Sequence, residues 1–164
     1  MKTVVVGFGN ILMGDEGVGV YIVNELSKIM GERDDVELID GGTAALDVIT
    51  SLKGVDKLII IDAVISNGKV GDVYRLHNFS ISEIQKNRLE KFSLHEMGLL
   101  EVLHIAEQLK VLPKDIVFFG IEVKEVKPQS ISLSTSHLPF FAPPQGPFRR
   151  DFEQFVIGQI PPVK

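Results

Sequence analysis

The residues of this chain that could do chemistry are acids and one histidine that follow or begin apolar segments. Asp15 and Glu16 come shortly after the apolar run Val4-Val5-Val6, in a turn that also holds Gly7 and Gly9. Two carboxylates repel a phosphate and attract a metal ion or a cationic group. The turn is therefore typical of a cation site, although acids are also common in the first turn of a helix, where the helix dipole stabilises them.

The glycines of this turn resemble a dinucleotide-binding loop only in part. The spacing Gly7-x-Gly9 is present, but Leu12 stands where the third glycine of that fingerprint is expected. Together with the two acids, this departure argues against a bound pyrophosphate. A nucleotide- or flavin-binding protein with the same fold stays open as an alternative.

The order of apolar segments predicts an α/β fold. Strands spaced by helical segments imply right-handed crossovers and a parallel sheet. We expect a flavodoxin-like, doubly wound, five-stranded and mostly parallel sheet flanked by helices. The predicted strands cover 4–6, 36–40, 57–62, 70–77 (an edge or antiparallel strand) and 116–121, and the predicted helices cover 18–29, 45–52 and 93–110. Strand 57–62 is the most apolar and is predicted to be central.

Two more acids end predicted strands, Asp40 the second and Asp62 the third. The carboxyl ends of parallel strands line one crevice, where the strand order reverses. In the order 2-1-3-4-5 the first and third strands are neighbours, so Glu16 and Asp62 would face each other, with Asp40 on the other side of the first loop. Either aspartate could instead be an ordinary turn residue.

His95 is placed near a helix start by the capping box Ser93-Leu94-His95-Glu96. A helix N-terminus lowers the pKa of a histidine, which keeps the imidazole neutral and able to bind metal. Glu16, Asp62 and His95 would form a three-ligand site for a divalent transition metal. A solvated histidine in the first helical turn is the plainer alternative.

Composition limits the other possibilities. The chain has 164 residues, a net charge of -5 and no cysteine, which excludes disulfides, thiolate metal sites and a cysteine nucleophile. The acidic balance argues against nucleic acid as a partner. No apolar run approaches the ~18 residues of a membrane span, so we expect a cytoplasmic protein without a membrane partner. Signatures of zinc proteases, serine hydrolases and P-loop nucleotide hydrolases are also missing.

The motifs, taken together, resemble those of the hydrogenase maturation endopeptidases. The resemblance rests on Gly7-Phe8-Gly9-Asn10-x-Leu12-x-x-Asp15-Glu16-Gly17-x-Gly19, Asp40-Gly41-Gly42-Thr43, Asp62-Ala63, Ser93-x-His95 and Gly120-Ile121, and it spans residues 1–134. It implies a peptidase that removes a C-terminal peptide from the precursor of a NiFe hydrogenase large subunit after nickel insertion. Nickel, carried by that precursor, would contact Glu16, Asp62 and His95, and no nucleotide would be needed.

The resemblance leaves the hydrolytic step open. Asp40 is a candidate general base, with Glu16 and Asp62 as further candidates for catalytic roles. A non-enzymatic nickel-binding chaperone is another alternative. We expect one catalytic domain over 1–134 and a proline- and aromatic-rich tail over 135–164 with one short helix near 148–156. The protein is expected to be a monomer, unless the tail mediates self-association.

Overall fold

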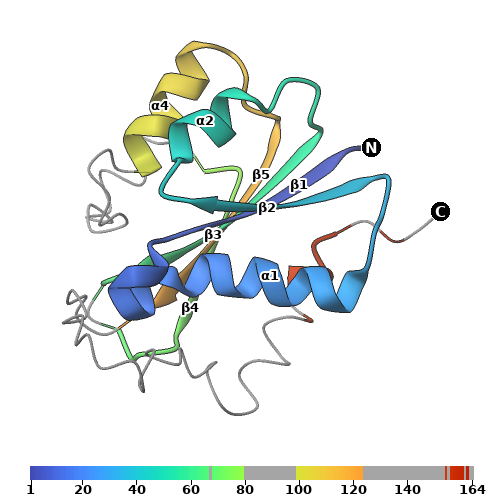
Figure 1. The fold of residues 1–164 in the computed structure, drawn as a ribbon. Coiled ribbons are helices and arrows are strands. Elements are labelled where there is room, and N and C mark those ends of the chain that lie inside the picture. The colour runs from blue at the N-terminus through green and yellow to red at the C-terminus, as the bar shows by residue number, and fades with distance from the viewer. Residues whose placement is uncertain (67, 80–98, 124–153, 155, 161, 163–164) are drawn as a thin grey trace.

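A computed structural model describes residues 1–66, 68–79, 99–123, 154, 156–160 and 162, which form a three-layer α/β domain (Figure 1). The sequence alternates between apolar strands and amphipathic helices, as expected for βαβ units. The elements are β1 (Thr3–Phe8), the 3₁₀ segment η1 (Ile11–Gly17), α1 (Val18–Met30), β2 (Val36–Gly42), α2 (Ala45–Thr50), β3 (Lys57–Val64), β4 (Val73–His77), α4 (Leu99–Gln108) and β5 (Asp115–Glu122).

The sheet has the order β2-β1-β3-β5-β4. Strands β2, β1, β3 and β5 are parallel, whereas β4 pairs antiparallel with β5 at the edge. The central position of β3 and the edge position of β4 confirm two predictions. The order differs from the expected 2-1-3-4-5 because the connection between β3 and β4 has no helix. Such a connection reverses the direction of the chain, and β5, which follows α4, takes the parallel position beside β3.

Helices cover both faces of the sheet (Figure 1). Val5, Ile59 and Phe119 belong to the buried cluster on the α1 face, whereas Val6 and Ile60 belong to the cluster beneath α2 and α4. The two clusters alternate along each strand because neighbouring side chains point to opposite faces. β3 is buried almost throughout, which explains why its sequence is nearly all apolar.

Close backbone packing fixes the start of α1 against the sheet. A Cβ atom on Gly7 would lie 2.0 Å from the carbonyl oxygen of Gly19, and one on Gly19 would lie 2.3 Å from the carbonyl oxygen of Ile61. Only glycine allows this approach of helix to strands. The contact holds the N-terminal end of α1 over β1 and β3, and therefore holds the residues just before it.

The predictions for the helices are confirmed where the structure describes them. α1 matches the expected 18–29, and α4 forms the later part of the helix expected from 93. The capping box 93–96 lies outside the described residues. Near the C-terminus Gln154, Val156 and Ile157 are helical, and Val156 is buried in the α1-side cluster. Most of the tail is outside the described part, so the boundary at 134 and the oligomeric state stay predictions.

None of the helices described here is long and apolar enough to span a membrane.

Candidate active site

Glu16 is buried although it lies in the loop between β1 and α1. Glu16 is only 4% exposed, whereas the neighbouring Asp15 faces solvent. The segment η1 turns Glu16 inward through a kink, where Met13 and Gly14 leave helical geometry and Gly14 takes φ 65°. The two adjacent acids therefore have different surroundings, and only Glu16 lies in the interior.

Gly9 permits this inward turn. Its φ of +139° is disfavoured for residues with a side chain, and a Cβ atom there would lie 2.0 Å from the carbonyl oxygen of Glu16. The Gly9 amide also donates a hydrogen bond to the carbonyl of Gly42 at 2.9 Å. The glycine-rich turn thus brings the backbone at Glu16 close to β1, and it ties this loop to the end of β2.

Asp62 lies near the carboxyl end of β3 and is 1% exposed. Its Oδ1 accepts a hydrogen bond from the Ala63 amide at 2.8 Å. Its Oδ2 is buried and has no hydrogen-bond partner within the described part of the chain. A buried polar atom without a hydrogen-bond partner lowers the stability of the fold. Such atoms are typical of sites where a ligand supplies the missing contact.

The electrostatics connect Asp62 with Glu16. Burial raises the pKa of the Asp62 carboxyl to about 8, the hydrogen bond from Ala63 opposes this increase, and the charge of Glu16 adds to it. Two carboxylates that share one buried region resist simultaneous ionisation, because each charge raises the cost of the other. A divalent cation between them would remove that cost.

The prediction that Glu16 and Asp62 meet at one end of the sheet is therefore in agreement with the structure. Asp40 is exposed near the end of β2. Its Oδ1 accepts a hydrogen bond from the Gly42 amide at 3.1 Å. This is the turn arrangement that the sequence left open. His95 lies outside the described residues, so its place in the site stays a prediction. Within those residues no three acids or histidines lie close enough to hold a metal ion.

Sequence reasoning did not identify a third buried carboxylate at this end of the sheet, that of Glu122. It is 2% exposed and lies in β5 opposite Val64. It accepts hydrogen bonds from the Ser66 amide at 2.9 Å and from the Ser66 hydroxyl at 2.5 Å. Tyr74 extends the network, since its hydroxyl lies 2.8 Å from Ser66 Oγ. The signal in the sequence is an acid inside the apolar run Gly120-Ile121-Glu122-Val123.

The Glu122 carboxylate differs from that of Asp62 because its oxygens have donors. Burial alone would raise its pKa, but hydrogen bonds from Ser66, Tyr74 and the Gly68 backbone outweigh burial and hold the pKa below its usual value. Glu122 is therefore a satisfied structural carboxylate that fixes the connection from β3 to β4. Asp62 has an oxygen left over for another partner.

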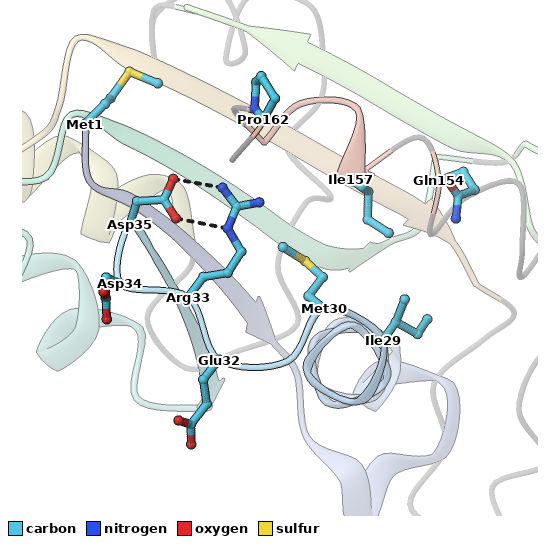
Figure 2. Close-up of a pocket in the computed structure, with 10 residues that line it drawn as sticks. All are labelled: Met1, Ile29, Met30, Glu32, Arg33, Asp34, Asp35, Gln154, Ile157 and Pro162. Atoms are coloured by element: carbon cyan, nitrogen blue, oxygen red, sulfur yellow. Dashed lines mark hydrogen bonds and ion pairs between the residues drawn. The ribbon is translucent and has the colours of Figure 1, made fainter. Parts of the chain in front are cut away.

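A cavity of about 940 Å³ lies elsewhere on the domain, beside Met1 and the C-terminal end of α1 (Figure 2). Its walls include Met30, Ile157 and the ion pair between Arg33 and Asp35, whose two hydrogen bonds measure 2.9 and 2.8 Å. Met1 precedes β1 and Asp35 precedes β2, so the cavity is at the amino ends of these strands. It contains none of the predicted site residues.

The site at the carboxyl ends suits a cation and not a phosphate. Phosphate sites in this type of fold use backbone amides at a helix N-terminus and avoid nearby carboxylates. Here Glu16 and Asp62 are both buried at the corresponding place. The nucleotide-binding alternative therefore finds no support in the geometry, whereas metal coordination or carboxylate-assisted hydrolysis would use these groups directly.

Comparisons with known proteins agree with this description. The family model described as hydrogenase maturation protease matches residues 20–136. Hydrogenase 2 maturation protease of Escherichia coli K12 is 33% identical over 129 residues, which cover 78% of this chain and 77% of that protein. The hydrogenase expression/formation protein HupD of Bradyrhizobium diazoefficiens is 33% identical over 121 residues, 74% of this chain but only 62% of its own length.

Solved structures give the same result. The hydrogenase maturating endopeptidase HybD from Escherichia coli is similar with a TM-score of 0.68 and 28% identity, over 97% of this chain and 89% of that one. The [NiFe] hydrogenase maturation protease HybD from Thermococcus kodakarensis has a TM-score of 0.62 and 27% identity, over 77% of this chain and 83% of that one. The chain therefore belongs to the hydrogenase maturation proteases and is a peptidase of that family.

Proposed function

We propose that this peptidase removes a C-terminal peptide from the precursor of a NiFe hydrogenase large subunit, and that it does so only after nickel has entered the precursor. Nickel arrives with the substrate and is contacted by Glu16, Asp62 and His95. The protease thereby distinguishes nickel-loaded precursor from nickel-free precursor. Metal coordination is strong and directional, so a nickel-free precursor would lack the anchor that aligns the scissile bond.

The observation that carries the nickel contact is the buried oxygen of Asp62. Oδ2 has no hydrogen-bond partner in the described residues, and the neighbouring buried carboxylate is that of Glu16. This pair supports binding of a divalent cation that comes from outside the chain. His95 is proposed as the third contact because carboxylate and imidazole together suit a transition metal better than carboxylates alone.

Asp40 is proposed as the general base that activates the attacking water. Its exposure leaves the carboxylate accessible to water and to an extended substrate, and its hydrogen bond with Gly42 fixes its orientation. Gly9 connects the Asp40 turn to the loop of Glu16 through the Gly42 carbonyl. The proposed base thus lies on a turn that is tied to the loop of Glu16, one of the proposed nickel contacts.

The test is a cleavage assay on purified nickel-loaded precursor, with the product followed by gel shift and intact mass. Glu16→Gln, Asp62→Asn and His95→Ala should each lower the rate at least about a hundredfold, since each removes one contact that aligns the substrate. Glu25→Gln is the matched control. Glu25 is a buried acid of α1 that pairs with Lys28 at 2.6 Å, away from the loop, and its variant should cleave at the wild-type rate.

The same proteins separate the protease from a nickel chaperone. Equilibrium dialysis with nickel alone should show weak binding to the wild type, because two carboxylates and one imidazole without a thiolate hold a free transition metal weakly. Tight binding of free nickel without any shortening of the precursor would support the chaperone and reject the proposed function. Wild-type cleavage by all three site variants would reject their assignment as nickel contacts.

A further inference from the structure

Two large apolar side chains, Ile11 and Leu12, face solvent in the loop that carries Glu16. Ile11 is 66% exposed and Leu12 is 73% exposed, the highest value for any large apolar residue in the described part of the chain. Together they form an apolar ridge on η1. Scattered apolar residues on a surface are ordinary, so the exposure gains meaning only from how the ridge is held and what lies beside it.

The ridge is held rigidly. The Asn10 side chain accepts a hydrogen bond from the Leu12 amide at 3.0 Å, and the Asn10 carbonyl accepts one from the Met13 amide at 2.9 Å. Gly17 packs closely against the backbone of Ile11, since a Cβ atom on Gly17 would lie 2.8 Å from Ile11 Cα. The chain thus orders a loop that displays two apolar side chains, although a polar residue at either position would suit water better.

The ridge is also continuous with the candidate active site. Ile11 and Leu12 begin the same 3₁₀ segment in which Glu16 turns into the interior, and the exposed Asp15 lies between them and the helix. A partner that brings a cation to Glu16 would meet this loop, because Glu16 belongs to the same segment as the ridge and Asp15. The surface it meets is apolar at the ridge and acidic beside it, which complements an apolar polypeptide that carries a bound cation.

We propose that the Ile11–Leu12 ridge is a docking surface for apolar side chains of the hydrogenase precursor next to its nickel centre. This inference rests on the proposed function and adds the chemistry of the contact. The nickel provides the signal for loading, and the ridge provides binding energy that does not depend on nickel. Burial of one such side chain in an interface strengthens binding roughly tenfold or more.

The test measures KM and kcat for nickel-loaded precursor with Ile11→Ser, Leu12→Ser and the double variant. Each single substitution should raise KM about tenfold and leave kcat within about twofold, because the catalytic groups stay in place. Leu12→Met keeps the apolar area and should retain the wild-type KM. Leu109→Ser is the matched control, as Leu109 is 58% exposed at the end of α4, where the chain leads to the amino end of β5.

Binding of nickel-free precursor gives a readout that does not require cleavage. The double variant should bind it at least tenfold more weakly than the wild type and Leu109→Ser do, at an unchanged melting temperature. Equal KM and equal binding for the ridge variants and the control would overturn the proposal.

A wild type that binds precursor through the ridge without cleaving it would reject the proposed function and keep the docking surface. A wild type that dimerises in sedimentation, with dimers lost in Leu12→Ser and precursor binding unaffected, would assign the ridge to self-association and overturn the proposal.

Discussion

Asp62→Asn should make the protein more stable at high pH, even though it removes a residue of the candidate active site. Burial and the charge of Glu16 raise the pKa of the folded Asp62 carboxyl to about 8, compared with 3.8 for an unperturbed one. The folded chain therefore holds a proton that the unfolded chain releases. Between these two pH values unfolding loses a proton, so the free energy of unfolding falls as pH rises through that range.

The magnitude follows from the difference between the two pKa values. From 3.8 to about 8, it corresponds to roughly 6 kcal/mol, reached fully only above pH 8. This is a ceiling, because water entry and relaxation around an ionised carboxylate reduce the cost of burying its charge. Asparagine has the shape of aspartate, keeps an oxygen for the Ala63 amide and never ionises. The variant should match the wild type near pH 4 and exceed it by several kcal/mol at pH 9.

Urea unfolding followed by far-ultraviolet circular dichroism at pH 5, 6, 7, 8 and 9 measures this directly, since the chain contains no tryptophan for fluorescence. Asp40→Asn is the control. It makes the same chemical change at an exposed carboxylate, and its stability should follow that of the wild type at every pH. A parallel loss of stability by Asp62→Asn and the wild type between pH 5 and pH 9 would show that Asp62 holds no such proton in the folded chain.

Three further predictions concern the residues around the site. Glu122→Gln should cost about 2 kcal/mol at pH 7, because a carboxylate that accepts several hydrogen bonds is replaced by an amide that brings donors of its own. The hydrogen bonds that lower the pKa of Glu122 stabilise the fold above the unfolded value near 4.5, and this contribution is lost as pH falls through the folded pKa. Melting temperatures should therefore converge in acid, and a gap that stays constant down to pH 2 would contradict this. Gly19→Ala should destabilise the fold by at least about 2 kcal/mol and reduce cleavage, since the new methyl group would lie 2.3 Å from the carbonyl oxygens of Ile61 and Phe8; a wild-type melting temperature would disprove the close packing. Asp40→Asn should retain the bond to the Gly42 amide and the wild-type melting temperature, but lower the cleavage rate at least about a hundredfold if Asp40 is the base; an unchanged rate would remove that role.

The sequence was sufficient to predict the part of the site that depends on strand order. The apolar run of β3 indicated a strand buried on both faces, and the loop after β1 carried glycines and acids in a recognisable pattern. Because parallel strands end at one edge of the sheet, the meeting of Glu16 and Asp62 followed from their positions at the carboxyl ends of neighbouring strands. This prediction needed no knowledge of side-chain orientation.

Features that depend on side-chain contacts could not be predicted in this way. The unpartnered Oδ2 of Asp62 results from which groups lie within reach of the end of β3. Glu122 was missed because a glutamate near a strand end is usually solvated, whereas here Ser66 and Tyr74 enclose it. The place of β4 depends on which of two strands, β4 or β5, pairs with β3. In the structure β5 pairs with β3, and β4 lies at the edge.

Single-turnover cleavage of the same precursor with and without nickel tests whether the protease distinguishes the nickel-loaded substrate from the nickel-free one. Intact mass spectrometry would follow the loss of the C-terminal peptide over time, with wild-type protease in excess over either form. We predict shortening of the nickel-loaded precursor and none of the nickel-free precursor over the same period. Equal rates for the two forms would be compatible with a hydrogenase maturation protease. They would contradict the proposal that the protease recognises nickel in its substrate through Glu16, Asp62 and His95.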